Sequence, residues 1–213
     1  MEQQAAGTVD QAQERRVRLN PLDLATANVS SLWTERHAWL MYGLVRWLRP
    51  EHCVEVGAFA GFSSMHIAQA LKDNGAGHLW CIDDYSLGTS ASQIHNNLVR
   101  IGCGDRVTLV SGDSRKVEWP KHVDFAFIDG DHSFDGCRLD CDDAIQRGAK
   151  CVCVHDTQGW WGPAEYLEVF REQSQGAWDV IEQCFDSGFA VLLRRDAKQP
   201  PFYTEKTHPL GHV

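Results

Sequence analysis

The sequence predicts an α/β fold, in which helices cover both faces of one mainly parallel sheet. From about residue 50 the chain alternates short apolar runs rich in Val and Ile with longer stretches of helix-like sequence, an alternation typical of stacked β-α units. A length of 213 residues suits one domain. Hydrophobic residues make up 43% and charged residues 23% of the chain, so the composition is that of an ordinary globular protein.

The elements follow in chain order. Apolar residues recur at helical spacing over residues 31–48, so an amphipathic helix is expected before the sheet. Five parallel strands are then predicted, each ending next to Gly, Asp or His: 52–56, 78–83, 106–110, 123–128 and 150–154. The helices expected among and after them cover 62–72, 90–101, 134–147 and 163–175. Two last strands, 178–185 and 189–194, are separated by only three residues, so they form an antiparallel hairpin and complete a seven-stranded sheet.

We expect the domain to cover residues 31–197, because residues 1–30 and 198–213 show no periodicity. The first segment is expected to be an extension that is flexible or closes over a ligand, and the second a tail. Residues 1–16 lack the layout of a secretory signal, and no stretch approaches the roughly 18 apolar residues that span a bilayer. Several of the eight cysteines stand within apolar runs, as reduced buried thiols do. These observations predict a cytoplasmic protein with no membrane partner.

The charge balance limits the partners. Twenty Lys and Arg against 29 Asp and Glu give a net charge of −9, which disfavours a protein that binds the nucleic-acid backbone. Residues 124–143 hold seven Asp and one Arg, and this segment either holds a cation or faces water. Asp135 and Asp142 fall on the helix face opposite Cys137 and Cys141, which assigns part of the acidic excess to a solvated surface.

A loop with two glycines follows the first predicted strand and leads into a helix. Gly57 and Gly61 let the backbone turn sharply and approach a ligand, and the start of the helix offers free N–H groups. The loop lacks the dinucleotide fingerprint, because Phe59 and Phe62 stand where further glycines would be needed. It indicates a nucleotide-type site, although a turn that merely needs two glycines would have the same sequence. The residues expected at the ligand are Glu55, Gly57, Ala58, Gly61 and Ser63.

Acidic residues mark the ends of the next two strands. Asp83 and Asp84 stand some twenty-odd residues past the glycine loop, where a carboxylate can accept hydrogen bonds from the ribose hydroxyls of a nucleoside. Asp113 and Ser114 follow the third strand, and Asp113 can accept from an adenine amino group. Asp is also common in surface turns. However, ligands of open parallel sheets bind at the carboxyl ends of the strands, which favours a shared site.

The glycine loop, Asp83, and Gly112-Asp113 together resemble those of a class I S-adenosylmethionine-dependent methyltransferase, over about residues 35–195. More narrowly, the segments FIDGDHSFDG (127–136) and VHDT (154–157) resemble a small bacterial subgroup of methyltransferase family 24 type, which includes metal-dependent sugar and natural-product O-methyltransferases. The resemblance implies a Rossmann-like sheet, S-adenosylmethionine as cofactor and methylation of a hydroxyl of a small-molecule acceptor. It also implies that association into a homo-oligomer is common.

A divalent metal site is expected at the ends of the fourth and fifth strands. Asp129 follows one strand, and His155 and Asp156 end the next. Adjacent strands lie about 4.8 Å apart, so these side chains can converge on one cation. Two carboxylates and an imidazole suit Mg²⁺, Mn²⁺ or Fe²⁺, which would bind a substrate hydroxyl and lower its pKa. His155 departs from the two acidic residues that the most similar metal-dependent relatives have at this point.

His132 is the expected general base. It lies three residues after Asp129, and an imidazole of pKa near 6.5 suits this role. In the resembling family the Asp of this segment is a metal ligand and the His a base, which makes Asp129 and His132 the catalytic pair. Asp131 either orients His132 or caps the helix that begins at Phe134. Trp160 and Trp161 either line a substrate pocket or pack in the core.

Two other functions remain open at this point. The chain can be a partner subunit that binds the cofactor without catalysis. It can also be a hydroxylase-like enzyme in which Asp129, His132 and His155 hold iron. The residue pattern does not identify the methyl acceptor.

Overall fold

The computed structural model describes residues 35–158, 161–174, 176–184 and 186–197. The predicted segments 1–30 and 198–213 lie outside the described residues. The strands are β1 (His52–Val56), β2 (His78–Asp83), β3 (Val107–Ser111), β4 (Phe125–Ile128), β5 (Cys151–His155), β6 (Trp178–Gln183) and β7 (Phe189–Arg194). The helices are α2 (Glu35–Leu48), α3 (Phe62–Asn74), α4 (Ala91–Arg100), α5 (Phe134–Gln146) and α6 (Trp161–Gln173).

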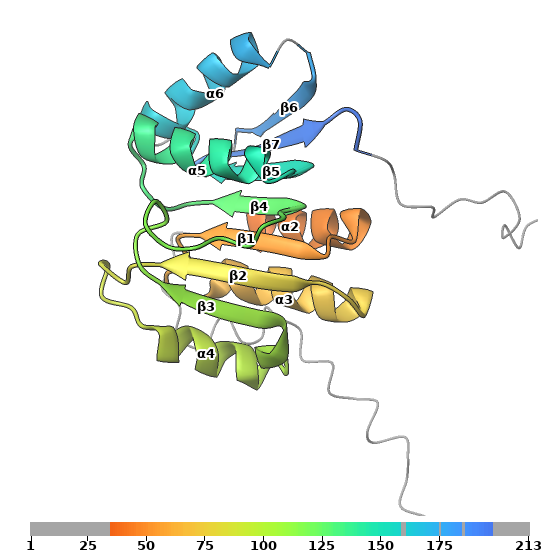
Figure 1. Ribbon diagram of the computed structural model, residues 1–213, viewed down its shortest axis with the longest axis vertical. Helices are drawn as coiled ribbons and strands as arrows, with labels where there is room; N and C mark the ends of the chain where they lie inside the picture. The colour runs from red at the N-terminus through yellow and green to blue at the C-terminus, as the bar shows by residue number, and fades with distance from the viewer. Residues whose placement is uncertain (1–34, 159–160, 175, 185, 198–213) are drawn as a thin grey trace, which may run out of the picture.

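The strands form one seven-stranded sheet in the order β3-β2-β1-β4-β5-β7-β6 (Figure 1). Strands β1 to β5 are parallel, whereas β7 is antiparallel to both of its neighbours. The predicted fold class is therefore confirmed, including the terminal hairpin. The chain runs from β1 outward to β2 and β3 and then returns to β4 on the other side of β1, so the strand order reverses between β1 and β4. Ligands of open parallel sheets bind at such a reversal.

The predicted strand bounds agree with the observed ones to within two residues. The largest differences are at the fourth strand, which begins at Phe125 rather than at 123, and at the sixth, which ends at Gln183 rather than at 185. Asp124 stands just before β4, and its carboxylate accepts hydrogen bonds from the backbone nitrogens of Glu51 and His52 at 3.1 Å. These two hydrogen bonds join the start of β1 to the residue that precedes β4.

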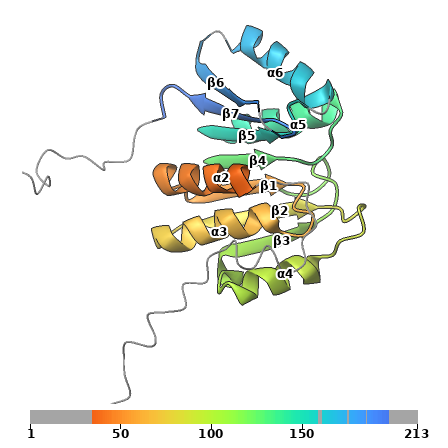
Figure 2. The same ribbon diagram turned by 180° about the vertical axis from the view of Figure 1, so that it is seen from behind.

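Two apolar cores lie on the two faces of the sheet. Helices α2, α3 and α4 pack on one face through residues such as Met41, Ile67 and Ile94, and α5 and α6 pack on the other through Cys141 and Leu167 (Figures 1 and 2). Every residue of β4 and β5 is buried, as expected of central strands that are covered on both faces. Seven of the eight cysteines are buried, as the apolar runs around several of them predict.

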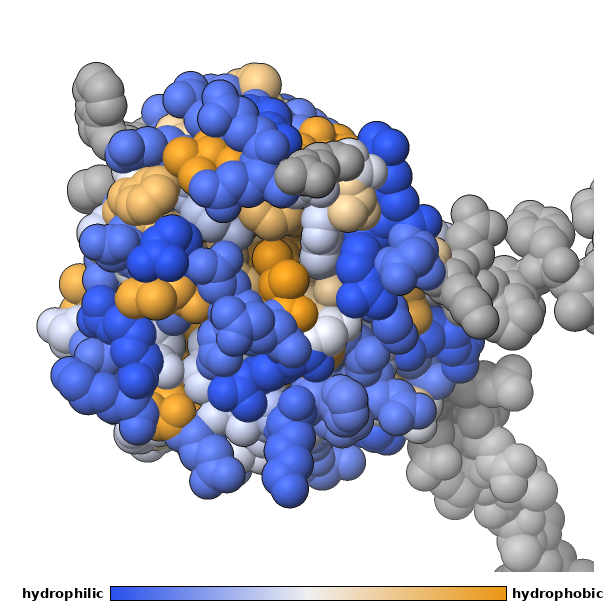
Figure 3. Space-filling view, turned by 45° about the horizontal axis from the view of Figure 1, so that its top comes forward, coloured by the Kyte–Doolittle hydropathy of each residue, from blue (hydrophilic) through white to orange (hydrophobic). Residues whose placement is uncertain are grey.

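The surface carries part of the acidic excess. On α5, Asp135 and Asp142 both pair with Arg138, and Asp143 pairs with Arg147. These three carboxylates lie on the outer side of the helix, as predicted. The face of the molecule in Figure 3 is mostly hydrophilic, and its apolar side chains form small separate groups. Among the described helices, none has the length and apolar character that crossing a bilayer requires.

Candidate active site

A cavity of about 490 Å³ lies at the carboxyl ends of β1 to β5. Each of these strands contributes a lining residue at its end or just after it: Gly57, Asp83, Gly112, Asp129 and Asp156. The cavity therefore occupies the edge at which the strand order reverses. Its volume is in the range of pockets that hold small ligands and cofactors.

The loop after β1 has the backbone that its glycines predict. Gly57 has φ 85° and Gly61 has φ 86°, both in the left-handed region that favours glycine. Gly61 is also the N-cap residue of α3, so the loop leads directly into the helix. Of the loop residues predicted to bind a ligand, Gly57 lines the cavity. The others are buried and are not among the lining residues: Glu55, Ala58, Gly61 and Ser63.

Glu55 supports the loop from within the core. Its side chain is fully buried and accepts hydrogen bonds from the hydroxyls of Ser63 and Ser64, the latter at 2.5 Å. Burial raises the pKa of Glu55 to about 7. Because these bonds join β1 to the first turn of α3, Glu55 fixes the loop geometry and does not face the ligand cavity.

The two acidic residues at the end of β2 both line the cavity. Asp83 accepts a hydrogen bond from the backbone nitrogen of Phe59 at 2.8 Å and another from that of Tyr85 at 2.6 Å. Asp84 accepts from the backbone nitrogen of Ser86 at 2.9 Å. Asp83 thus joins the loop after β1 to the loop after β2.

The loop after β3 presents Asp113 and Ser114 to the cavity. Hydrogen bonds from Arg115 and then Lys116 hold the pKa of Asp113 well below its usual range. Ser114 donates a hydrogen bond from its Oγ to Oδ1 of Asp140 at 2.6 Å. Asp140 is only 2% exposed, and burial raises its pKa to about 6.

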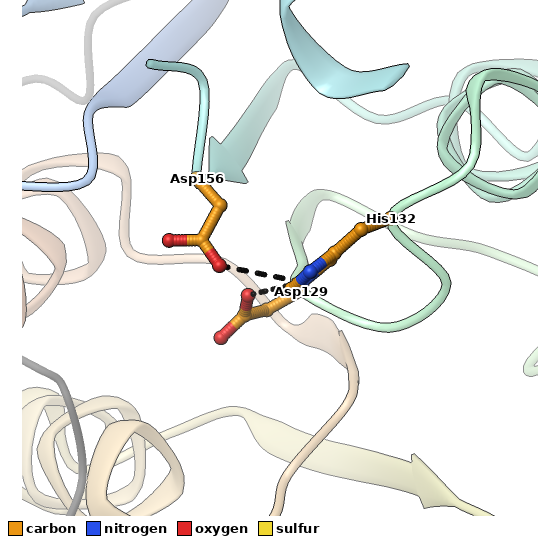
Figure 4. A group of neighbouring side chains, drawn as sticks. All are labelled: Asp129, His132 and Asp156. Carbon is orange, nitrogen blue, oxygen red and sulfur yellow. Dashed lines mark hydrogen bonds and ion pairs between the residues drawn. The ribbon is translucent and has the colours of Figure 1, made fainter. Parts of the chain in front are cut away.

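Asp129, His132 and Asp156 meet at the other end of the cavity (Figure 4). Nε2 of His132 lies 3.4 Å from Oδ1 of Asp129 and 3.4 Å from Oδ2 of Asp156. One ligand atom from each of the three residues lies within 4.8 Å of the others. The hydrogen bond to Asp129 raises the pKa of His132. Asp156 has φ 56°, a backbone conformation that costs free energy for a residue with a side chain and that recurs at functional sites.

His155 lies beneath these carboxylates and is only 4% exposed. Its Nδ1 is 3.1 Å from Oδ1 of Asp129 and 3.1 Å from Oδ1 of Asp156. Burial lowers the pKa of His155, but the hydrogen bonds to both carboxylates outweigh it and raise the pKa to about 9. The structure therefore brings the three predicted metal ligands together and adds His132 to them.

The interpretation of Asp131 as the cap of α5 is wrong. The N-cap residue is Ser133, whose side chain accepts a hydrogen bond from the backbone nitrogen of Gly136 at 3.0 Å. Asp131 instead accepts from the backbone nitrogen of Ser133 at 2.9 Å and pairs with Arg115 at 3.1 Å. Ser133 is two residues closer to the helix, so it fills the cap position first. The side chains of Trp160 and Trp161 lie outside the described residues.

Sequence reasoning missed several residues of the site. Phe59 lines the cavity with φ 46°, and Arg115 lines it while pairing with both Asp113 and Asp131. One indication of Arg115 is present in the sequence: it stands two residues after Asp113, at a sheet edge that is otherwise acidic. Asp140 was missed as well, although it stands on the same helix face as Cys137, Cys141 and Ala144, which the apolar periodicity placed in the core.

Comparison with known proteins supports a specific family. Residues 54–157, which contain all of the strand-end residues described above, match the model of a family described as a methyltransferase domain. These residues belong to a methyltransferase domain. No curated protein sequence matches the chain.

Solved structures share the fold of this methyltransferase domain. An O-methyltransferase of tomaymycin synthesis from Streptomyces achromogenes, in complex with S-adenosylmethionine, has a TM-score of 0.63 and 18% identity over 88% of this chain and 91% of its own. An O-methyltransferase from Bacillus cereus, in complex with S-adenosylhomocysteine, has a TM-score of 0.62 and 16% identity over 81% and 88%. A Podospora anserina methyltransferase has a TM-score of 0.59 and 16% identity over 83% and 86%. At such identities the likeness extends to the fold alone.

Proposed function

We propose that this protein transfers a methyl group from S-adenosylmethionine to a hydroxyl oxygen of a small molecule. One observation carries the proposal: a single cavity of about 490 Å³ joins the glycine loop and the acidic end of β2 to the cluster of Asp129, His132 and Asp156. Methyl transfer needs a cofactor site and a deprotonating site in contact, and the cavity has candidates for both. The cofactor-bound O-methyltransferases with the same fold support this choice.

The cofactor is proposed to lie along the ends of β1, β2 and β3. Gly57 lets the backbone approach it, Asp83 and Asp84 accept hydrogen bonds from the ribose hydroxyls, and Asp113 and Ser114 lie at the nucleobase. The acidic wall suits a ligand that carries a positive sulfonium. Phe59 adds an aromatic side chain to the same wall.

The acceptor end has a donor set that fits a divalent metal ion. Two carboxylates and one imidazole, from Asp129, Asp156 and His132, are ligands that Mg²⁺, Mn²⁺ and Fe²⁺ accept. A bound cation would lower the pKa of an acceptor hydroxyl, so that the oxygen attacks as an alkoxide at neutral pH. The chain itself supplies the two carboxyl groups and holds them against Nδ1 of His155 at 3.1 Å.

This proposal exchanges the expected roles of the two histidines. His155 was expected to be a ligand and His132 a base, but the side chain of His132 is 27% exposed with Nε2 3.4 Å from both carboxylates, whereas that of His155, which also lines the cavity, is only 4% exposed. If methyl transfer persists without metal, the imidazole of His132 is the proposed general base, and Asp129 and Asp156 would stabilise the imidazolium that forms.

The first test is binding of S-adenosylhomocysteine, measured by isothermal titration. The wild type should bind it with a stoichiometry of one. Asp83→Asn should weaken binding by about tenfold or more, because an amide cannot accept from ribose and from two backbone N–H groups. Asp105→Asn, at an exposed carboxylate outside the cavity, is the matched control and should bind like the wild type. Absence of binding in the wild type would overturn the proposal.

The acceptor class needs a second measurement. Purified protein is incubated with S-adenosylmethionine carrying a labelled methyl group and a panel of sugars, phenols and other hydroxylated molecules, and methylated products are identified by mass spectrometry. A non-catalytic partner subunit would bind the cofactor and methylate nothing. A hydroxylase-like enzyme would contain stoichiometric redox-active iron after purification.

We also propose a cytoplasmic location, and partners that are small molecules rather than nucleic acids. The free thiols support the first, because disulfides are typical of oxidising compartments. The net charge of −9 supports the second. Cell fractionation and a filter-binding assay with duplex DNA test them. Homo-oligomerisation stays a prediction.

A further inference from the structure

A third histidine, His37, lies behind the active site on α2. Its side chain is completely buried, and its ring stacks on Phe189 of β7 with the centroids 5.0 Å apart and the planes 25° apart. Its Nδ1 lies 3.3 Å from Nε2 of His155, a contact between residues that are 118 positions apart in sequence. Helix α2, which comes before the sheet, thereby reaches the residue that supports the metal-binding carboxylates.

His155 stands between His37 and the two carboxylates. Carboxylate oxygens only accept hydrogen bonds, so Nδ1 of His155 carries the proton that Asp129 and Asp156 share at 3.1 Å. On the other side of the ring, Nε2 faces Nδ1 of His37 at 3.3 Å and Oγ of Ser187 at 3.4 Å. Both nitrogens of His155 are therefore placed against polar groups of the protein, and the ring has one orientation that satisfies all of them.

The shared Nδ1–H holds two like charges near each other. Asp129 and Asp156 would repel one another without it, and each would turn away from the common centre. Without His37, Nε2 of His155 would lose the nearer of the two polar atoms described beside it and keep Oγ of Ser187 at 3.4 Å, which weakens the hold on this rotamer. Loss of His37 thus reaches the carboxylates through its contact with His155.

We propose that His37 is a positioning residue of the active site: through His155 it fixes Asp129 and Asp156 at the spacing that a divalent cation requires. This inference rests on the proposed function, since it concerns the metal-binding half of the same cavity. Partners of this kind that orient metal ligands commonly change metal affinity by 10- to 100-fold when they are removed. A purely structural His37 would contribute to core packing and have no effect on the cation.

The test compares His37→Leu, which keeps bulk and removes the polar contact, with His37→Asn, whose amide places a polar atom near the position of Nδ1. Full-chain wild type and variants are titrated with MnCl₂ alone, and separately with S-adenosylhomocysteine. We expect His37→Leu to weaken Mn²⁺ binding by about 10- to 100-fold and His37→Asn to recover most of that loss. Affinity for S-adenosylhomocysteine should stay within about twofold of the wild type, because the cofactor half lies at the ends of β1 to β3.

His66→Leu is the matched control. His66 is also a completely buried histidine, and it lies on α3, where its Nδ1 contacts the carbonyl oxygen of Phe62 at 2.9 Å. This change should lower the midpoint of thermal unfolding and leave Mn²⁺ affinity unchanged. If His37→Leu does not fold, His37→Gln replaces it, because its longer side chain carries the amide past the position of Nδ1.

Three results overturn the inference. The first is equal Mn²⁺ affinity in the wild type and His37→Leu. The second is an equal loss of affinity in His37→Leu and His66→Leu, which would indicate a general effect of core damage. The third is a wild type that binds no Mn²⁺. In each case binding of S-adenosylhomocysteine reports separately on the proposed function, which fails only if the wild type does not bind the cofactor product.

Discussion

Gly57 and Asp129 approach each other so closely that no side chain fits between them. A Cβ atom on Gly57 would lie 2.2 Å from the carbonyl oxygen of Asp129. Two hydrogen bonds hold the surrounding backbone in place, from the nitrogen of Gly57 to the oxygen of Ile82 and from the nitrogen of Asp129 to the oxygen of Val56, both at 2.9 Å. The loop proposed to bind the cofactor and Asp129, the proposed metal ligand, are thus packed directly against each other through their backbones.

Gly57→Ala should destabilise the protein by about 3 kcal/mol or more, because the methyl group overlaps backbone atoms and φ 85° is unfavourable for alanine. Urea unfolding measures this loss. Gly43→Ala is the control: no heavy atom lies within 4 Å of the added Cβ on this exposed position of α2, so stability should rise by up to about 1 kcal/mol. An unfolding midpoint for Gly57→Ala equal to that of the wild type would contradict the close contact.

Glu55→Gln should change how stability depends on pH. The pKa of Glu55 is about 7 in the folded protein, above its usual 4.5, so the folded state holds this proton more tightly. The contribution of Glu55 to stability is therefore largest below pH 4.5 and is lost as the pH rises to 7. The free energy of unfolding of Glu55→Gln, relative to the wild type, should rise by up to about 3 kcal/mol between pH 4.5 and pH 8.

Denaturant unfolding at several pH values measures this difference. Glu165→Gln, an exposed change on α6, serves as the reference for removing a carboxyl group. The explanation fails if the difference between Glu55→Gln and the wild type is the same at all pH values.

Ser114→Ala should remove the hydroxyl that binds buried Asp140. The pKa of Asp140 is raised to about 6, and Oδ2 has no hydrogen-bond partner among the described residues. Loss of the Ser114 hydroxyl should cost about 1 to 3 kcal/mol of unfolding free energy at pH 8, where the carboxylate is charged, and less at pH 5. Chemical denaturation at the two pH values measures this cost. The double variant Ser114→Ala/Asp140→Asn should recover part of it, and a similar cost at both pH values would argue against this account.

Chelation should abolish methyl transfer to an acceptor found in the labelled-methyl assay. Protein treated with EDTA and then dialysed should regain turnover with Mg²⁺ or Mn²⁺, because the donor set of Asp129, His132 and Asp156 fits these cations. Asp156→Asn should lose at least about 100-fold in turnover with metal present. Full turnover after chelation would instead assign the deprotonation to His132, and His132→Ala would then be inactive.

The fold was accessible from the sequence because its indications are local. Each strand is an apolar run of the right length, and the three-residue connection between the last two strands specifies a hairpin without reference to the rest of the chain. Strand ends are equally local, so Asp83, Asp113, Asp129 and Asp156 could be placed at one edge of the sheet.

Side-chain orientation within the site was less accessible. The ring of His155 is oriented by His37 and Ser187, which lie 118 and 32 residues away in sequence. No spacing rule relates such positions, so His155 was expected to be a metal ligand, whereas we now propose that it supports the ligands. Asp140 was not predicted for another reason. A carboxylate on an apolar helix face is costly to bury, and the hydrogen bond from the hydroxyl of Ser114, which offsets part of this cost, is seen only in the structure.

The stacking of His37 on Phe189 has a consequence for biosynthesis. The ribosome synthesises the chain from the N-terminus to the C-terminus. Helix α2 and every strand that carries a cavity residue therefore leave the ribosome before Phe189 of β7. Until that strand is added, His37 lacks the ring of Phe189 on which it stacks in the folded chain. A nascent chain that stops short of residue 189 therefore contains all the residues named at the cavity and still lacks the aromatic contact that packs His37 against the sheet.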